Sequence, residues 1–528
     1  MNAIITDVAY LLTACAVTYV AHYYYKYFTR ESPLPGPFPL PLIGSLHKIH
    51  GNIDKYCTSC QKKYGDMFEL WICSQRLIFL GNAEVNEKLF VGSLSKSNFT
   101  KRSVSENFEA LGFSRIGLVF NNDSSSWNYN RKLIEQALMK PSFLRNLMDD
   151  IQCIYEEMEG YWKIIESKEP GAVHDMADWC IRFTTDITFY MSTSKHAYCM
   201  ASYFNKVVPD HKINVPGDAV NESEEFASRT QTYIDSLNFW YFWSPFTVNY
   251  IPGFSYMHKK YKDNIKWLYD RIYKLIYARR AEIKKISEDV PLRPDILTLF
   301  ITANTERELE KVKGVTNRET LRPMTDDEIC YNIFDITEAG IDTAANAMCF
   351  TIYFLSKYPE HKQKVHEELD SVLGPNHDRR IAYEDLDKLQ YLEAVIKESL
   401  RHIPIIPFAF KISDKDDFIG GKFFRGGQVF FVSFSGIHNN KKDWPDTEKF
   451  DPTRFLNPIG KNTFLPFGGG PRICPGRHIG MMEIKTFLAS VYRKFDVNLA
   501  DPNAPANEEL GFVNHCKKCE VRITPRNC

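Results

Sequence analysis

The sequence predicts a mainly α-helical fold with a minor β region, built as a single large domain behind an N-terminal transmembrane helix. Three observations support this prediction. A chain of 528 residues, 44% of them hydrophobic, is long enough to bury a large core. Helical periodicity of apolar residues dominates from about residue 127 to 400. Extended segments are short and gather around residues 67–81 and 427–438.

The N-terminal residues 1–28 predict a membrane anchor. Residues 8–25 contain no Lys, Arg, Asp or Glu, although His22 interrupts the apolar run. A helix of this length rises about 27 Å, close to the thickness of a thin bilayer. The basic residues Lys26 and Arg30 follow the run, which predicts that the bulk of the chain lies in the cytoplasm. A cleaved signal peptide and a buried helix are the alternatives.

Residues 29–44 predict a proline-rich hinge. Five prolines and two glycines stand between residues 33 and 44, and this density excludes a helix and favours stiff, extended chain. A plain linker is the alternative. The remaining residues, 45–528, then form the large domain.

Charge and cysteine content exclude some classes of protein. The 65 basic residues nearly cancel the 66 acidic residues, so nothing predicts a nucleic-acid partner. The 13 cysteines are odd in number and scattered, which favours reduced thiols over a disulfide framework. The two CxxC pairs, Cys57 with Cys60 and Cys516 with Cys519, are interpreted as ordinary thiols rather than a shared zinc site.

One long helix is predicted to begin at a capping box, Thr325 to Glu328, and to stop before Pro359. At about 50 Å it would cross a whole domain. It is not a membrane span, because Asp335, Glu338 and Asp342 lie inside it. A helix that keeps acids in its middle must pass something that needs them.

The loop FLPFGGGPRICPGRHIG, residues 464–480, surrounds Cys474 with glycines. Glycines 468–470 and Gly476 would allow backbone amides to approach a thiolate. The following residues have helical spacing, and a helix N-terminus favours the ionised thiol. A single cysteine with no second ligand at zinc spacing would serve a cofactor that brings its own other donors, as haem does, and Arg472 could pair with a haem propionate.

This loop resembles the haem-binding signature F-x-x-G-x-R-x-C-x-G of the cytochrome P450 family, at Phe467, Gly470, Arg472, Cys474 and Gly476. The resemblance implies the cytochrome P450 fold and a heme b cofactor (iron protoporphyrin IX). It implies that Cys474 is the axial metal ligand of the haem iron and that Phe467 shields the sulfur of Cys474.

Further motifs of the family occur in the expected order. Glu398 and Arg401 of KESLR resemble its E-x-x-R pair, and Arg454 of FDPTRF resembles the third member. The resemblance implies that these three are structural and fix the cysteine loop, whereas an isolated E-x-x-R is usually a surface pair.

Four residues are implied to bind the cofactor. Trp127 and Arg131 of WNYNR resemble the family's W-x-x-x-R and fall on one helical face, His438 resembles another propionate contact, and Lys411 stands where many relatives have arginine. Taken alone, Trp127 is more typical of a core residue than of a cofactor contact, and the cysteine signature is what favours the cofactor role.

The segment AGIDT, residues 339–343, resembles the family's oxygen-activation motif. Gly340 would let the cofactor approach the helix, while Thr343 and Asp342 are implied to be catalytic, the hydroxyl binding reduced oxygen and the acid relaying protons. The alternatives are a Thr343 bonded back to its own helix and a solvated Asp342.

The resemblance predicts a haem-thiolate monooxygenase at the endoplasmic reticulum membrane, with its catalytic domain in the cytosol. It would insert one atom of O2 into an apolar substrate, with electrons from a separate NADPH-dependent reductase and cytochrome b5 as an alternative donor. The rival functions are a haem-thiolate isomerase or dehydratase that uses neither O2 nor a reductase, and a non-catalytic haem carrier.

Candidate reductase contacts are Arg477, Lys485, Lys132 and Lys140. The aromatic residues 236–246 predict either a channel mouth at the membrane or ordinary core.

Overall fold

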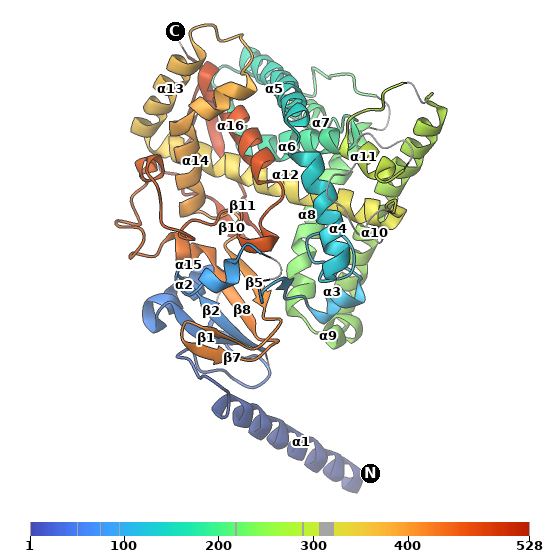
Figure 1. Cartoon of the computed structure of the whole chain (residues 1–528), viewed down its shortest axis with the longest axis vertical. Helices are drawn as coiled ribbons and strands as arrows, with labels where there is room; N and C mark the ends of the chain where they lie inside the picture. The colour runs from blue at the N-terminus through green and yellow to red at the C-terminus, as the bar shows by residue number, and fades with distance from the viewer. Residues whose placement is uncertain are drawn as a thin grey trace. The chain divides into compact units, whose positions relative to one another are not determined.

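The computed structural model describes residues 2–49, 51–73, 75–93, 96–216, 219–287, 290–305 and 322–526. Helices dominate and the sheets are small, which confirms the predicted fold class (Figure 1). The backbone forms two compact units. The first unit comprises residues 1–103, 406–449 and 459–473, and the second unit comprises residues 104–405, 450–458 and 474–528. Neither unit is a continuous piece of sequence.

The first unit is built on a five-stranded sheet. Its order is β1 (Met67–Ile72), β2 (Gln75–Leu80), β8 (Val429–Ser433), β5 (Phe408–Ile412) and β3 (Lys101–Arg102). β2 and β8 run parallel, and the other pairs are antiparallel. All residues of the central strand β8 are buried, so it reads as one apolar run rather than an alternation. A hairpin of β6 (Asp417–Ile419) and β7 (Lys422–Phe424) and the helix α2 (Ile53–Tyr64) complete the unit.

Strand prediction was right for residues 67–81 and only half right for residues 427–438. The chain leaves β8 at Ser433 and enters the short helix α15 (Phe434–His438). The Ser433 side chain accepts a hydrogen bond from the Gly436 amide and so caps this helix. A serine inside an apolar run was the signal for this change.

The helix α1 (Asn2–Phe28) confirms the predicted helix but not the predicted membrane span. Among the residues that the structure describes, no helix is both long and apolar enough to cross a bilayer. The helix α1 has 27 residues, which is long enough to cross a bilayer, so it is the polarity of its side chains that excludes it. His22, the threonines and the run of tyrosines lower its hydropathy.

The proline-rich segment is fastened to the sheet and does not stand apart from it. The Glu69 amide of β1 donates to the Pro35 carbonyl over 2.9 Å, and Gly44 forms a bridge with Ile72. A Cβ atom on Gly36 would lie 2.1 Å from the Glu69 carbonyl oxygen, so only glycine fits. The buried Glu69 carboxylate also pairs with Arg30 over 2.5 Å, which ties the end of α1 to the same strand.

The second unit is a helical body with two small sheets. The sheets are β4 (Val173–Asp175), β12 (Glu520–Pro525) and β9 (Phe495–Leu499), and the hairpin of β10 (Glu508–Leu510) and β11 (Asn514–Cys516). Its helices are α3 (Glu106–Ala110), α4 (Ser124–Leu138), α5 (Pro141–Lys168), α6 (Met176–Thr193), α7 (Cys199–Val207), α8 (Ala219–Phe242), α9 (Pro245–Tyr250), α10 (Pro252–Lys285), α11 (Ile296–Thr302), α12 (Asp326–Lys357), α13 (Pro359–Leu373), α14 (Gln390–His402) and α16 (Arg477–Lys494).

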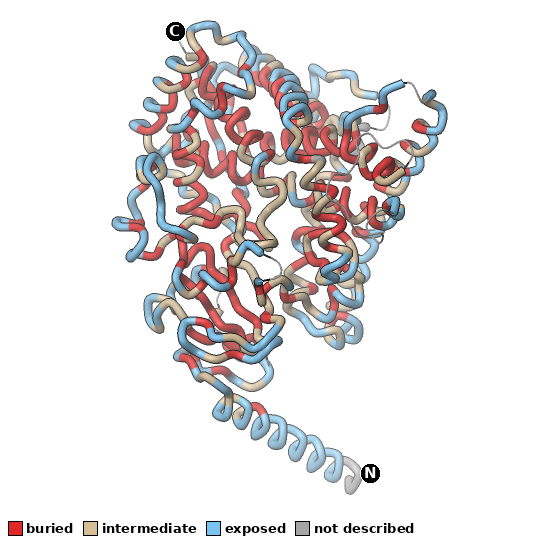
Figure 2. The backbone as a smooth tube through the Cα atoms, in the orientation of Figure 1, coloured by how far each residue is buried: buried red, intermediate tan, exposed pale blue. Residues whose placement is uncertain are grey.

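The helix α12 is the long helix that the sequence predicts, and it forms the centre of the second unit. It packs against α6, α10, α14 and α16, and its middle and C-terminal half are mostly buried (Figure 2). Its closest neighbour is α6, because a Cβ atom on Gly340 would lie 3.1 Å from Thr188 Cγ2. The Thr184 hydroxyl donates to the Ile341 carbonyl over 2.9 Å at the same crossing. The glycine therefore allows these two helices to approach.

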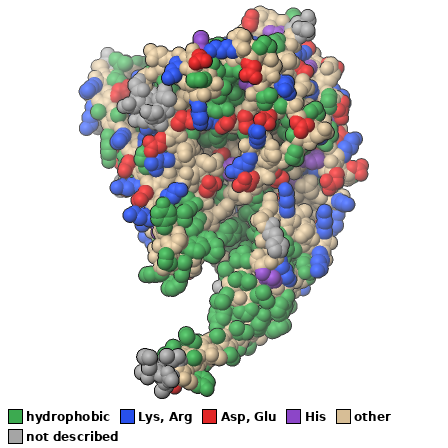
Figure 3. Space-filling view, turned by 180° about the vertical axis from the view of Figure 1, so that it is seen from behind, with side chains coloured by type: hydrophobic (Ala, Val, Ile, Leu, Met, Phe, Trp, Pro, Cys, Tyr) green, Lys and Arg blue, Asp and Glu red, His purple; other side chains and the backbone are tan. Residues whose placement is uncertain are grey.

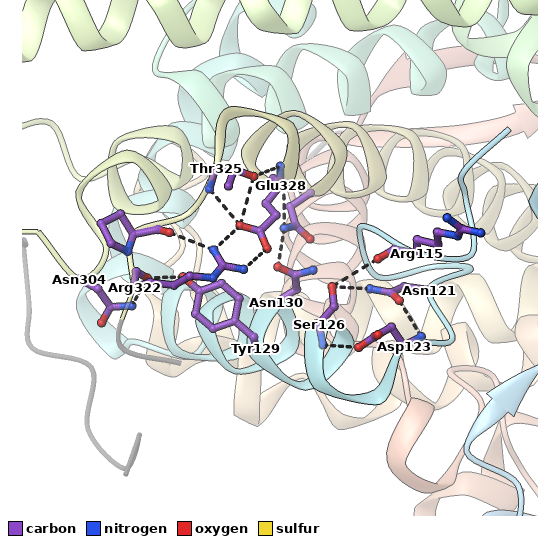
Figure 4. Close-up of polar contacts among 12 residues, drawn as sticks. Arg115, Asn121, Asp123, Ser126, Tyr129, Asn130, Asn304, Arg322, Thr325 and Glu328 are labelled. Carbon is purple, nitrogen blue, oxygen red and sulfur yellow. Dashed lines mark hydrogen bonds and ion pairs between the residues drawn. The ribbon is translucent and has the colours of Figure 1, made fainter. Parts of the chain in front are cut away.

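Polar contacts fix the start of α12 against α4. The predicted capping box is present, with the Thr325 side chain accepting from the Glu328 amide. Glu328 also pairs with Arg322, whose carbonyl accepts from the Tyr129 hydroxyl of α4 over 2.7 Å (Figure 4). One turn further along, Asn332 donates to Asn130 over 3.0 Å. The position of α4 is thus set by the N-terminal turns of α12.

Substituting two glycines tests this packing. Gly36→Ala is expected to lower the thermal unfolding midpoint, because the added methyl would overlap the Glu69 carbonyl. Gly160→Ala in α5 meets no atom within 4 Å and should stabilise the protein by about 0.5–1 kcal/mol, since alanine loses less entropy in a helix. Calorimetry measures both. A Gly36→Ala variant as stable as the native protein would contradict the contact with β1.

Candidate cofactor and active site

Cys474 lies in the second unit, just before the first turn of α16. Gly476 is the N-cap of that helix, as the spacing predicted. The unsatisfied amides of a helix N-terminus favour an ionised thiol nearby. The loop from Pro466 to Arg477 is half-buried throughout, so the cysteine lies neither in the core nor fully in solvent. A partly accessible cysteine beside a helix N-terminus is suited to ligating a metal centre.

The glycines of this loop differ in the packing around them. A Cβ atom on Gly476 would lie 3.9 Å from Cys474 Sγ, an ordinary contact that leaves room for a side chain. In the first unit, a Cβ atom on Gly469 would lie 2.8 Å from Phe90 Cδ1, and Gly470 has a φ of +68°. The glycines at 469 and 470 are therefore required because the loop packs tightly on Phe90. Phe467 is half-buried at the start of the same stretch.

Three cations gather in the first unit. Lys411 of β5 is buried, and its ammonium donates to the Leu89 carbonyl over 3.0 Å. Arg102 is its partner across the strands, and Arg472 donates from Nε to the Thr100 carbonyl over 2.8 Å. Burial, with the charges of Arg102 and Arg472, lowers the pKa of Lys411 to about 7. A buried ammonium with two half-buried guanidinium groups near it favours an anion, and the carboxylates of haem satisfy that requirement.

His438 is fully buried in α15, and one of its ring nitrogens has a structural partner. The Leu465 amide donates to His438 Nε2 over 2.8 Å, a bond that holds the start of the cysteine loop. Because Nε2 accepts this bond, only Nδ1 could serve a propionate.

Trp127 and Arg131 lie on one face of α4, as the spacing predicted, and both are buried. The Arg131 guanidinium lies 6.0 Å from the centre of the Trp127 ring and pairs with Glu135 over 2.7 Å. The arginine therefore already has an anionic partner on its own helix.

Glu398, Arg401 and Arg454 are brought together in the second unit. Both Glu398 and Arg401 are completely buried and form two hydrogen bonds of 2.7 and 2.9 Å. Arg454 Nε lies 3.6 Å from the same carboxylate, which also accepts from the Asp451 amide over 2.9 Å. The carboxylate thus fixes residues 451–454 to α14. Sequence reasoning missed His402, whose Nε2 lies 3.4 Å from Glu398.

Three acids inside α12 have separate partners. Asp335 accepts from the Leu118 and Val119 amides over 2.6 and 3.0 Å, and Glu338 accepts from the Thr230 hydroxyl of α8 over 3.2 Å. Asp342 is buried beside His515, so the alternative of a solvated acid is wrong. Burial raises the pKa of Asp342, partly opposed by the nearby charge of His515. Acids at intervals along an apolar helix predict that the helix makes buried polar contacts, but the sequence does not indicate which residues are the partners.

Thr343 lies on a more open face of α12. Its hydroxyl donates to the Ala339 carbonyl over 2.7 Å, which is the back-bonded arrangement considered above. Ala339 is nevertheless exposed and Thr343 half-buried, although the residues around them in the helix are mostly buried. The face that carries these two residues is accessible to a ligand.

Two other predictions change. Lys485 is buried and pairs with Glu393 over 2.8 Å, so it cannot contribute to a reductase-docking face. The aromatic residues 236–246 differ in exposure, because Trp240 belongs to the buried core while Phe246 is 65% exposed. Figure 3 shows hydrophobic side chains gathered on the surface around α9. The exposed apolar side chains of α9 and its neighbours include Trp243, Phe246, Tyr250 and Tyr256.

The Glu398 cluster predicts a specific loss of stability in acid. Burial would raise the pKa of Glu398, but bonds from His402 and Arg401 outweigh it, so the folded-state pKa is below its ordinary value. This contribution is complete above pH about 4.3 and is lost as pH falls further. Glu398→Gln should lower the free energy of unfolding at pH 7 by about 3 kcal/mol or more and flatten its acid dependence.

Urea unfolding between pH 3 and 7 measures this effect. The matched control is Glu384→Gln, which removes the acid of the exposed pair with Arg145 and should change stability little. Equal losses from the two substitutions would contradict a special role for the buried carboxylate.

Comparison with known proteins agrees with this geometry. The family model described as Cytochrome P450 matches residues 34–523. The chain is 26% identical to "Probable cytochrome P450 508D1" of Dictyostelium discoideum, over 89% of each protein. It is 26% identical to "Cytochrome P450 2E1" of Bos taurus, over 95% of this chain and 94% of the relative. It is 25% identical to "Steroid 17-alpha-hydroxylase/17,20 lyase" of Ictalurus punctatus, over 92% and 89%. The chain therefore belongs to the cytochrome P450 family.

Proposed function

We propose that this protein is a haem-thiolate monooxygenase that inserts one atom of O2 into an apolar substrate, with electrons from a separate NADPH-dependent reductase. Members of the family bind haem and generally act as monooxygenases with a redox partner. The observation that carries the proposal is the accessible face of α12 at Ala339 and Thr343, next to the buried acid Asp342. An accessible hydroxyl beside an acid of raised pKa is suited to supplying protons.

The residues present fit a haem. In the second unit, Cys474 would hold the haem iron through its sulfur, with Trp127 and Arg131 as further contacts; in the first unit, the cations Lys411 and Arg472 would hold carboxylates, with His438 as a further contact. When bound, haem supplies oxygen activation, which a thiolate ligand favours by donating electron density. Each of three candidates already has one partner in the protein: Arg131 pairs with Glu135, His438 Nε2 accepts from the Leu465 amide, and Lys411 donates to the Leu89 carbonyl.

Thr343 would hold and pass on a proton on the reacting side of α12. Its hydroxyl now donates to the Ala339 carbonyl, and rotation about Cβ–Oγ1 would turn the proton toward a ligand on the accessible face. Asp342 would restore that proton, because burial favours its protonated form.

Aromatic side chains support an apolar substrate. Phe108 and Phe120 lie 4.7 Å apart, and Phe113 lies 6.1 Å from Trp240, between ring centres. Phe120 also lies 6.1 Å from Phe512, in the turn of the β10–β11 hairpin. The chain around residues 108–120, the helix α8 and the β10–β11 hairpin thus meet in one aromatic cluster, which suits an apolar ligand.

We also infer contact with the endoplasmic reticulum membrane. The exposed side chains of α1 include Leu11, Leu12 and Val17, and a helix end with exposed tyrosine and phenylalanine suits an interface. The protein would thus lie close to a membrane-bound reductase and to apolar substrates.

Replacing the proposed ligand is the first test. Cys474→Ser should retain little or no haem, because a neutral hydroxyl is a poor ligand for the iron. The reduced carbon monoxide complex of the native protein should show the strongly red-shifted Soret band of thiolate ligation. Cys153→Ser, which changes an exposed cysteine on α5, is the control and should leave that band unchanged. An imidazole-type band in the native protein would overturn the assignment.

Removing the proposed proton carrier is the second test. Thr343→Ala should release more peroxide per NADPH consumed with the reductase, because about 10²-fold of proton-transfer catalysis is lost. Thr343→Ser keeps the hydroxyl and should retain most of the coupling. Turnover of a peroxidised lipid without NADPH or reductase would instead support the isomerase or dehydratase alternative, and no effect of either substitution would favour a haem carrier.

A further inference from the structure

Asp342 and His515 form a buried pair of ionisable side chains in the second unit. His515 Nδ1 lies 3.4 Å from Asp342 Oδ2, and the two side chains are only 8% and 4% exposed. They come from β11 and α12, more than 170 residues apart in sequence. Burying two ionisable groups costs desolvation free energy unless each group is the electrostatic partner of the other.

The β10–β11 hairpin is shaped around His515. The residue pairs with Glu509 across the hairpin, and a Cβ atom on Gly511 would lie 3.2 Å from His515 Nε2, so the turn leaves little room for a side chain there. The Asn514 amide donates to the Ile405 carbonyl over 2.8 Å, and its side chain donates to the Pro404 carbonyl over 2.8 Å. These contacts fix the imidazole with Nδ1 toward α12.

A second bridge joins the same hairpin to the same turn of α12. Asn346 accepts from the Cys516 amide over 2.7 Å and donates to the Asp342 carbonyl over 2.7 Å. Its amide nitrogen also lies 3.4 Å from Asp342 Oδ1. Each carboxylate oxygen thus has one defined neighbour, Asn346 for Oδ1 and His515 for Oδ2.

Four charged groups surround the Asp342 carboxyl. His515 and Lys517 are on the hairpin side and favour the carboxylate, whereas Asp235 of α8 opposes it. Glu338, one turn earlier in α12, is also buried, and its pKa is raised to about 8 by burial and by the acids Asp342 and Asp335. His515 is the one of these four residues that lies in contact with the Asp342 carboxyl, with Nδ1 3.4 Å from Oδ2.

We propose that His515 is a positioning residue for the reaction: it holds the carboxyl of Asp342, the residue before Thr343, against the β10–β11 hairpin and exchanges a proton with it. In the exchange the proton leaves His515 Nδ1 and binds Asp342 Oδ2, so that an imidazolium and a carboxylate become a neutral imidazole and a carboxylic acid. No electrons move and no other reactant is needed. This inference rests on the proposed function, because it supplies the acid that would restore the proton of Thr343.

The experiment follows the protonation of Asp342 without turnover. Infrared difference spectra of the full-length holoprotein are recorded against pH, and subtraction of Asp342→Asn isolates this carboxyl from Glu338 and other buried acids. His515→Gln removes the cation and should raise the pKa of Asp342 by about 1–3 units. His174→Gln is the matched control, because His174 is a buried histidine of β4 in the same unit and should leave that pKa unchanged.

Coupling is measured on the same proteins. His515→Gln and His515→Phe should both release more peroxide per NADPH, and the loss should be greater for phenylalanine, which cannot hydrogen-bond to the acid. A carboxyl that titrates at the same pH in native protein and in His515→Gln overturns the proposal, as does the absence of any titration that Asp342→Asn removes. A normal infrared result with no thiolate-type Soret band would refute the proposed function and leave the His515–Asp342 pair intact.

Discussion

The second unit depends on one constraint, which is that a long central helix carries carboxylates in an apolar environment. An ionised acid buried without a partner costs several kcal/mol, so each one must find a partner on a neighbouring element. In α12, Asp335 binds the amides of residues 118 and 119, Glu338 binds Thr230 of α8, and Asp342 lies against His515 of β11. The loop, the helix and the hairpin are positioned by these pairings. They are also the three places that contribute to the aromatic cluster.

Much of the local structure could be predicted from the sequence. The capping box at Thr325 and the helix after Cys474 depend on residues close together in the chain, and both were predicted correctly. The pair of Glu398 and Arg401 is likewise one helical turn apart. Local signals of this kind require no knowledge of the fold.

Contacts between distant residues could not be predicted. The bond of Asp335 to Leu118 spans 217 residues, and Gly469 and Gly470 of the cysteine loop pack against Phe90, far upstream. Lys485 read as a surface charge, but its helix turns it toward Glu393 in the interior. The predicted membrane span is not found among the described residues, in which no helix is both long and apolar enough to cross a bilayer. A sequence pattern predicts what kind of contact a residue needs, whereas the tertiary fold determines which distant residue provides that contact.

The alternation of the two units along the chain has a consequence for synthesis. The β1–β2 hairpin emerges from the ribosome early, but its parallel neighbour β8 begins only at Val429, and the chain that completes the same unit ends at residue 473. For most of translation, the apolar edge of β2 therefore has no strand to pair with. Such an edge is prone to aggregation, and its late pairing is slow because the closing loop is long. The nascent protein should therefore depend on a chaperone that shields this strand until β8 has emerged from the ribosome.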